Sequence, residues 1–348
     1  MEDPNPVTQP RSGATLLAGA IASIVALGAA GCAGERPGAA LADSPHDAAD
    51  RGRAPTAGPY VRVLGTVQDG GLPHAACACA RCEAARTDPS RRRRIASLAL
   101  CLPASGRVYL VDATPDIREQ LRDPCGTGGA SAGGVDRAPL DGVFLTHAHL
   151  GHYLGLAFFG FEAVHTRDLP LFGTRRMTDF LRNNAPWDQL VRLENVRLRD
   201  LEPDSAVVLE DGVRITPFLV PHRDEYTDTV GFAIEGPRRS LLYVPDTDRW
   251  STWKPSLPER LVGIDVAILD GTFYSPEELP GRDVTAIGHP TIETTMELLE
   301  PAVRTRALRV SFTHLNHSNP ALDPASSAAA RVRGNGFAVL QEGQVFAL

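Results

Sequence analysis

The sequence predicts an α/β protein in which two packed sheets carry helices on their outer faces. From Tyr60 onward, short strand-like runs alternate with segments of helical periodicity, and the strand-like runs outnumber the helical ones. Two sheets that pack together still need helices to cover their outer faces, which favours a layered arrangement. The chain has 348 residues, 43% of them hydrophobic, and is therefore long enough to bury such a core.

The predicted elements follow one another along the chain without an internal repeat. The predicted strands are YVRVLG (60–65), SLALCL (97–102), RVYLVD (107–112), GVFLT (142–146), VRITPFLV (213–220), VGFAIE (230–235), SLLYVPD (240–246), DVAILD (265–270), LRVSFTH (308–314), FAVLQ (337–341) and QVFAL (344–348). The predicted helices are PDIREQLR (115–122), TRRMTDFLRNN (174–184) and TIETTMELLE (291–300). Pro and Thr begin the first two helices, as is common at helix starts. The Gly-rich segment 123–142 predicts a mobile surface loop.

The N-terminal 59 residues differ in composition from the rest of the chain. Residues 1–32 resemble a lipoprotein-type signal peptide, because a small apolar run ends in Ala-Ala-Gly directly before Cys32. We expect an exported protein, anchored to the membrane only by a lipid on Cys32 and facing the periplasm. The alternatives are a plain cleaved signal peptide, a membrane-retained helix, or a misassigned start codon and a cytoplasmic protein. Residues 33–59 predict a flexible linker, and residues 60–348 form the predicted domain.

The net charge of the chain argues against one class of binding partner. The formal net charge is −7 and the sequence pI is about 5.8. A nucleic-acid-binding domain is normally basic, so these values argue against nucleic acid as a partner. We expect a small-molecule substrate, and the sequence does not define an oligomeric state.

Several apolar strands end in, or are directly followed by, a side chain that can bind a metal. These side chains are Asp112, His147, His222, Asp246, Asp270 and His314. Imidazole and carboxylate groups bind zinc or iron in hydrolytic sites, which collect ligands from separate elements and keep one position open. One histidine at a strand end is usually structural, but so many such positions in one chain indicate a metal site.

The segment LTHAHLGHYLG (145–155) places three histidines directly after a predicted strand. With RVYLVD, VPHRDEYTDTVGF, YVPD and FTHLNH, it resembles the motifs of the metallo-β-lactamase-fold superfamily in their usual order. The resemblance runs from about Tyr60 to Leu348 and implies an αββα four-layer sandwich. It also implies bound zinc, one or two ions, with iron or manganese as alternatives. The implied ligands are His147, His149 and His222 for one ion, His152 and His314 for the second, and Asp246 as the bridge between them.

Gly151 departs from this pattern, because the family's H-x-H-x-D-H motif has an aspartate there that binds the second ion. Three outcomes stay open: one ion only, two ions with three ligands left for the second, or recruitment of a nearby carboxylate such as Asp270 or Asp248. We expect the second ion to bind more weakly than the first, and Gly151→Asp to strengthen it. Asp69, Gly70 and Gly71 lie in a loop for which two roles stay open, lining the pocket or forming a structural turn, and the turn is favoured.

A second candidate metal site is the cysteine-rich segment CACARC. Its three thiolates lie too close in sequence to pair easily with one another, but they can bind one tetrahedral zinc if a fourth ligand joins them. The candidate ligands are Cys77, Cys79, Cys82 and His317. This cluster resembles the structural zinc site of two branches of the superfamily, the coenzyme PQQ synthesis protein B and the cyclic phosphodiesterase of the carbon-phosphorus lyase pathway. The alternative is a disulfide pair with one spare thiol, in which Cys101 or Cys125 can also take part.

The phosphodiesterase branch has a histidine beside its metals, and His289 lies at the matching place. The dipole of the following predicted helix disfavours the charged form of this imidazole, so we expect a neutral donor or a weak base unless a phosphate pairs with it. The alternative is a surface histidine next to the start of the helix. The whole pattern predicts a metal-dependent hydrolase of a phosphodiester or related ester that acts through a metal-bound hydroxide, with His289 and Asp246 as catalytic residues. The alternative is an accessory, carrier or oxidative metalloprotein in coenzyme PQQ biosynthesis.

Overall fold

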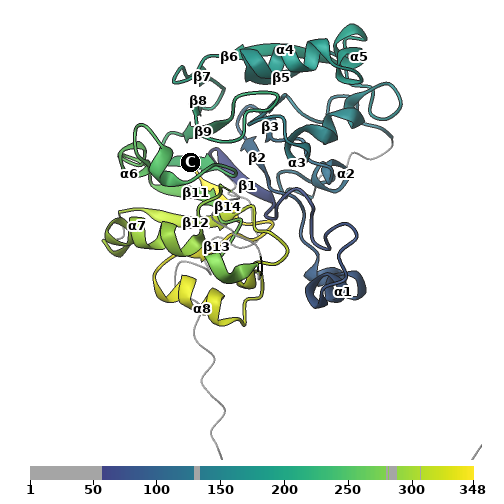
Figure 1. Cartoon of the computed structure of the whole chain (residues 1–348). Coiled ribbons are helices and arrows are strands. Elements are labelled where there is room, and N and C mark those ends of the chain that lie inside the picture. The colour runs from purple at the N-terminus through teal and green to yellow at the C-terminus, as the bar shows by residue number, and fades with distance from the viewer. Residues whose placement is uncertain (1–56, 129–133, 280, 282–287, 306) are drawn as a thin grey trace, which may run out of the picture. The chain divides into compact units, whose positions relative to one another are not determined.

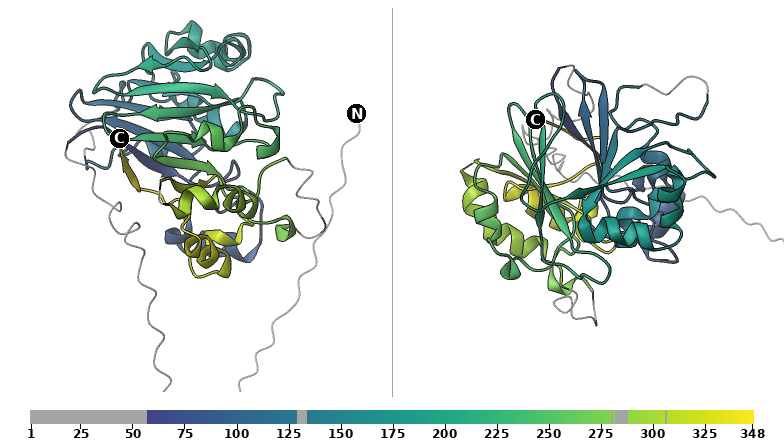
Figure 2. Two further views of the ribbon diagram at one scale, coloured as in Figure 1. Left: turned by 90° about the vertical axis from the view of Figure 1, so that its left-hand side faces the viewer. Right: turned by 90° about the horizontal axis from the view of Figure 1, so that it is seen from above.

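The computed structural model describes residues 57–128, 134–279, 281, 288–305 and 307–348. The predicted signal peptide, Cys32, most of the linker and part of the predicted loop 123–142 lie outside the described residues. Two seven-stranded sheets pack face to face, and helices lie on the outer side of each (Figures 1 and 2). The predicted αββα four-layer sandwich is therefore confirmed. Within the described part of the chain, no helix has the length and apolar character needed to cross a membrane.

Both sheets are mixed, with a parallel half and an antiparallel half. The first sheet contains, in order, β14 (Val345–Ala347), β1 (Tyr60–Gly65), β2 (Ser97–Leu102), β3 (Arg107–Val111), β4 (Gly142–Phe144), β5 (Leu169–Thr174) and β6 (Val196–Leu201). The second contains β13 (Ala338–Val339), β12 (Arg309–Thr313), β11 (Val266–Asp270), β10 (Ser240–Val244), β9 (Val230–Glu235), β8 (Arg214–Leu219) and β7 (Val207–Val208). Strands β3 to β6 are parallel to one another, as are β10 to β13, and the remaining pairs are antiparallel.

The helices lie outside the two sheets and give the sandwich three hydrophobic layers. They are α1 (Ala80–Thr87), α2 (Ile117–Gln120), α3 (Leu150–Tyr153), α4 (Arg175–Asn183), α5 (Trp187–Arg192), α6 (Leu257–Arg260), α7 (Ile292–Arg304) and α8 (Ser327–Gly334). One apolar cluster fills the space between the sheets, a second lies between the first sheet and α4 and α5, and a third lies between the second sheet and α6 to α8. Strand β2 shows why both faces of these strands are apolar: Leu98 and Leu100 belong to the central cluster, whereas Ala99 and Cys101 face the helices.

A disulfide joins Cys101 in β2 to Cys125 in the segment after α2. The Tyr60 hydroxyl donates a hydrogen bond of 2.8 Å to the Cys125 carbonyl, which further fixes this segment on the first sheet. Because Cys101 and Cys125 pair with each other, neither is paired with the predicted cysteine cluster, whose three thiols are free.

Strand direction explains why the candidate ligands gather at one edge of the sandwich. Strands β8, β10, β11 and β12 all point the same way, since β8 and β10 are both antiparallel to β9. The C-terminal ends of these four strands therefore lie side by side at one end of the second sheet. The parallel strands β3 and β4 likewise end side by side at one end of the first sheet. The structure brings these two ends together.

Candidate dinuclear metal centre

The first donor group consists of His147, His149, His222 and Asp246, whose ligand atoms all lie within 4.8 Å of one another. His149 Nδ1 lies 3.0 Å from His147 Nε2 and 3.1 Å from His222 Nε2. Asp246 Oδ2 lies 3.4 Å from His147 Nε2 and 3.2 Å from His222 Nε2. For ligand bonds of about 2.0–2.1 Å, a tetrahedral site places neighbouring donors about 3.3–3.4 Å apart. The first donor group therefore fits one divalent ion.

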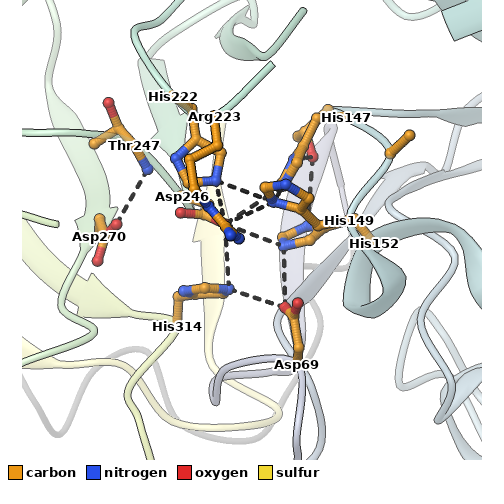
Figure 3. A network of polar contacts seen from close by, with 12 residues as sticks. Asp69, His147, His149, His152, His222, Arg223, Asp246, Thr247, Asp270 and His314 are labelled. Atoms are coloured by element: carbon orange, nitrogen blue, oxygen red, sulfur yellow. Dashed lines mark hydrogen bonds and ion pairs between the residues drawn. The ribbon is translucent and has the colours of Figure 1, made fainter. Parts of the chain in front are cut away.

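The second donor group consists of Asp69, His152 and His314 (Figure 3). Asp69 Oδ1 lies 3.5 Å from His152 Nε2 and 3.4 Å from His314 Nε2. His152 is fully buried, and its Nε2 has no hydrogen-bond partner. A buried imidazole nitrogen without a hydrogen-bond partner is costly unless it binds something else, so this atom also fits a metal ligand.

Asp246 lies between the two donor groups. Its Oδ2 atom, which contacts the first group, is also 3.8 Å from His152 Nε2 and 3.9 Å from His314 Nε2. The side chain is only 4% exposed, and its other oxygen has no hydrogen-bond partner. This position fits the bridging role that the sequence predicts for Asp246.

In each of the five histidine rings, the nitrogen that points away from the centre contacts a neighbouring side chain. The contacts are Thr146 Oγ1 to His147 Nδ1 at 2.9 Å, Glu225 Oε2 to His149 Nε2 at 3.0 Å, Asp112 Oδ2 to His152 Nδ1 at 2.7 Å, Asp248 Oδ1 to His222 Nδ1 at 3.3 Å, and Thr272 Oγ1 to His314 Nδ1 at 3.0 Å. Such outer contacts fix the ring orientation of metal-bound histidines. They leave the second nitrogen of every ring directed at the centre.

Two of the strand-end residues adopt a backbone conformation that L-residues rarely use. Asp112 has a φ of 64° and His314 a φ of 60°. Left-handed backbone at a residue other than glycine costs about 1–3 kcal/mol and is concentrated at functional sites. At these two strand ends the strained backbone turns an outer partner and a candidate ligand towards the centre.

The charges of the centre support cation binding. Burial alone would raise the pKa of Asp246, but His222, His314 and His289 outweigh it and hold this pKa well below its usual range. Burial would likewise raise the pKa of Asp69, but the neighbouring imidazoles of His152 and His314 outweigh burial and hold this pKa well below its usual range. Both carboxylates are therefore ionised at neutral pH, the state that a metal requires.

The pKa values of two buried imidazoles, His147 and His152, are shifted in opposite directions. Burial, assisted by the neighbouring His152, places the pKa of His147 well below its usual range, so this ring is neutral and ready to bind a cation. Burial would also lower the pKa of His152, but Asp112 and Asp69 outweigh it and raise this pKa well above its usual value. The second donor group thus already balances positive imidazole charge against carboxylate charge.

The carboxylates that the sequence suggests as substitutes for the missing aspartate have other partners. Asp248 holds His222 at the rim of the first donor group. Asp270 lies within reach of Asp246 and His314, but its oxygens accept hydrogen bonds from the Thr247 and Thr272 amides and contact His289. The structure instead places Asp69 in the second donor group, so of the two roles considered for its loop the structure supports lining of the pocket over a structural turn alone. The signal in the sequence was a carboxylate in the loop after the first strand, in a chain that lacks one at Gly151.

His289 lies beside the bridging aspartate, but its charge differs from the prediction. Its Nδ1 is 2.9 Å from Asp270 Oδ2 and 3.4 Å from Asp246 Oδ1. Burial would lower its pKa, but these two carboxylates outweigh burial and raise the pKa to about 9. This raised pKa runs against the expected neutral donor or weak base, because the adjacent carboxylates have more influence than the dipole of α7.

The candidate structural metal site is assembled as the sequence predicts. The ligand atoms of Cys77, Cys79, Cys82 and His317 lie within 4.8 Å of one another. Burial raises the pKa of Cys82 to about 11, whereas at the exposed Cys79 partial desolvation is outweighed by hydrogen bonds from the Cys82 amide and neighbouring groups, which lower its pKa. The His317 ring packs against that of His74 at 4.3 Å between ring centres. Three thiolates and one imidazole in one place fit a tetrahedral ion such as zinc.

The four-layer fold and the histidine-rich centre at the sheet edges define a metallo-β-lactamase-fold protein. Residues 107–315 match the family described as "Beta-lactamase superfamily domain", and the chain belongs to this family. The coenzyme PQQ synthesis protein B of Methylobacterium sp. (strain 4-46) is 28% identical over 305 residues, which cover 82% of this chain and 99% of that protein.

Two solved structures have a similar fold. The Zn²⁺-bound PqqB from Methylobacterium extorquens has a TM-score of 0.70 at 24% identity, and the match covers 83% of this chain and all of that one. A diphosphatase from the PhnP family has a TM-score of 0.59 at 23% identity, and the match covers 83% of this chain and 97% of that one. The predicted resemblance to these two branches is confirmed, and at these identities the structural likeness establishes the fold alone.

Proposed function

We propose that this protein is a metal-dependent hydrolase that cleaves a phosphodiester or a related phosphate ester at a dinuclear centre. The observation that carries the proposal is the position of Asp246 Oδ2, which lies 3.2 Å from His222 Nε2 in the first donor group and 3.8 Å from His152 Nε2 in the second. Two ions that share a carboxylate can stabilise both the attacking and the leaving oxygen of a phosphate ester. The likeness to a diphosphatase supports this substrate class.

The ions would be held by residues that the chain already orients. His147, His149 and His222 would hold the first ion, His152 and His314 the second, and Asp246 both. When bound, divalent ions supply Lewis acidity and lower the pKa of a water molecule. Zinc suits these nitrogen and oxygen donors, and iron or manganese also suit them.

His289 would bind the substrate phosphate. Asp270 is completely buried and holds His289 Nδ1, so Nε2 remains as the nitrogen that donates a hydrogen bond to a phosphate oxygen. The carboxylates beside the ring keep it protonated, and a cation at this position favours an anionic substrate over a neutral ester. The arrangement therefore favours phosphate esters over lactams or thioesters.

The experiment is metal analysis of the purified protein followed by assay with bis-p-nitrophenyl phosphate. We expect up to two ions at the centre and one at the cysteine cluster, with hydrolysis that is lost in His147→Ala and retained in His165→Ala, a histidine outside all candidate metal groups. No turnover, with a single ion held only by the cysteine cluster, would contradict the proposal.

The second candidate function is an accessory, carrier or oxidative metalloprotein related to the coenzyme PQQ synthesis proteins. The similarity to such a protein over nearly its whole length favours it. Iron in the purified protein, together with oxygen consumption in the presence of a quinone precursor and no ester hydrolysis, would support this function over the first.

We also propose that the protein is exported and anchored by a lipid on Cys32. The Cys101–Cys125 disulfide supports an oxidising compartment, because such bonds are rare in the cytosol. Labelling of the protein in cells with a radioactive fatty acid, and loss of the label in Cys32→Ala, would test the anchor. A protein recovered unlabelled from the cytoplasm would support the misassigned start codon instead.

A further inference from the structure

We propose that Asp69 is a ligand of the second ion, and that it replaces the carboxylate that the motif loses at Gly151. The inference deepens the proposed function by completing the second half of its metal centre, and it rests on that centre being dinuclear. It does not depend on which ester the protein cleaves.

The contacts of Asp69 indicate a ligand. Its side chain is 27% exposed, so the carboxylate is neither free in solvent nor part of the core. Among the described residues, its polar partners are His152 and His314, each through the Nε2 atom that faces the centre. A residue that only shapes a turn would direct its carboxylate at nearby backbone amides instead.

Gly151 lies where a side chain would collide with Asp69. A Cβ atom on Gly151 would lie 2.2 Å from Asp69 Oδ1, 2.5 Å from its Cγ and 2.8 Å from its Cα. These separations are far shorter than any non-bonded contact, so no larger residue fits at position 151 while Asp69 stays in place. The carboxyl group of Asp69 therefore occupies the space that the first side-chain atom of the family aspartate would need.

The backbone gives no independent reason for glycine at this position. Gly151 belongs to α3 (Leu150–Tyr153) and does not have a positive φ. Glycine is a poor helix former, so its presence in this helix calls for a reason in the surroundings. Asp69 provides that reason, since the two residues exclude each other sterically.

The segment that carries Asp69 is fixed next to the second donor group. Val67 is fully buried and forms isolated β-bridges with Ile95 and with Leu315, the residue after His314. The Gln68 amide donates to the Leu315 carbonyl at 3.1 Å, and the Leu315 amide donates to the Thr66 carbonyl at 3.1 Å. Asp69 thus enters the centre from backbone that is attached to the strand end bearing another ligand.

With Asp69 as ligand in place of an aspartate at position 151, the second ion keeps the same number of ligands and the same ligand charge. With Asp69, the second ion has two imidazoles, one carboxylate of its own and the shared Asp246, as it would with an aspartate at position 151. Four donors suffice for a divalent ion in a catalytic site. The loss at Gly151 is therefore compensated by a residue from a different element.

The test is titration of Zn²⁺ into the purified full-length protein after its metal has been removed by dialysis, followed by calorimetry and metal analysis. Wild type should bind two ions at the centre in addition to the one at the cysteine cluster. Asp69→Asn keeps the size of the side chain and should weaken the second ion by roughly 100-fold while the first is retained, because ligands matter at least as much as their outer partners. Asp204→Asn, at an exposed aspartate that pairs with Arg260, is the matched control and should bind like wild type.

An exchange of the two residues makes the test specific. Contrary to the expectation from the sequence, Gly151→Asp alone should lose the second ion, because its Cβ meets the Asp69 side chain. The double variant Asp69→Gly with Gly151→Asp is freed of the contacts with Oδ1 and Cγ, although the 2.8 Å contact with the Cα of residue 69 remains, and should bind the ion more tightly than either single variant. Retention of the ion at the cysteine cluster shows that each variant is folded. Wild-type affinity in Asp69→Asn, tighter binding in Gly151→Asp alone, or a wild-type centre with one ion would each overturn the inference. Two ions in wild type with no ester hydrolysis would contradict the proposed function but leave the role of Asp69 intact.

Discussion

The two halves of the metal centre differ in how they are built. In the first donor group, His147 and His149 come from one motif and two further ligands follow strands of the second sheet, with neighbouring donors 3.0–3.4 Å apart. In the second, His152, His314 and Asp69 come from three separate segments, with Asp69 Oδ1 at 3.4–3.5 Å from the two imidazoles. The first half follows the sequence motif, whereas the second depends on a residue outside it. Ligand identity can therefore move between elements while the geometry of a site is kept.

The largest expected effect comes from removal of a ligand from the first half. His222→Ala should lower kcat/KM for bis-p-nitrophenyl phosphate by roughly 1000-fold, because metal Lewis acidity contributes several kcal/mol to the rate. Calorimetric titration should show that the tighter of the two ions is lost. Equal weakening of both ions would show that the two halves do not bind independently.

His289→Asn should come next, with a loss of about 100-fold in kcat/KM if the ring positions and polarises the phosphate. The metal content should stay at the wild-type value, because His289 is not in either donor group. Esters with good and poor leaving groups should lose activity equally. A fall in metal content would show that His289 acts through the ligand Asp246 instead of the substrate.

Gly151→Ala tests the steric conflict with Asp69 alone, because it adds a methyl group and no charge to the second half of the centre. The added methyl group collides with Asp69 and should destabilise the protein by about 1–3 kcal/mol, as overpacking does elsewhere. Thermal unfolding followed by circular dichroism measures this cost. Gly334→Ala in α8, where an added Cβ meets nothing within 4 Å, is the control and should be neutral or stabilising. Asp69→Gly combined with Gly151→Ala removes the contacts with Oδ1 and Cγ but keeps the 2.8 Å contact with the Cα of residue 69, so it should recover stability only in part and should not recover the second ion.

The smallest effect on metal affinity should follow from loss of a side chain that contacts the outward-pointing nitrogen of a histidine ligand. Thr272→Val removes the hydroxyl that contacts His314 Nδ1 at 3.0 Å and should weaken the second ion about 10-fold, with the first unchanged. Thr178→Val in α4, which removes a hydroxyl that contacts Asp200 in β6, should change neither affinity. Competition with a chromophoric chelator would measure both affinities.

The sequence predicts the fold well where strands are buried on both faces and poorly at the edges. Every predicted strand overlaps a strand of the structure, because continuous apolar runs such as 97–102 are needed between two layers. The patterns do not predict β5 and β6. Strand β5 contains Pro170 and Gly173, and the edge strand β6 exposes Arg197 and Asp200, so neither has the composition of a core strand.

The helix boundaries show a similar limit. Pro301 predicts the end of the last long helix at residue 300, but α7 continues through it to Arg304. Residues 292 to 303 place Ile292, Met296, Leu299 and Val303 in the core, and this apolar face outweighs the local effect of proline.

The centre was predictable wherever one motif contains both the ligand and its strand. His147, His149, His152, His222, Asp246 and His314 meet as the motif implies. Asp69 was not predictable in this way, because its relation to Gly151 exists only in three dimensions. The charge of His289 was missed for the same reason, since Asp270 and Asp246 are distant in sequence and the helix was the only visible influence.

Two short segments carry ligands of both the dinuclear centre and the cysteine cluster. Asp69 and the three cysteines lie on one of them, while His314 and His317 lie three residues apart on the other. The β-bridge between Val67 and Leu315 joins the two segments. An ion at the cysteine cluster should therefore stabilise the backbone that places Asp69 and His314 in the second donor group. Oxidation of the three thiols should then weaken metal binding by the second donor group and leave metal binding by the first unchanged.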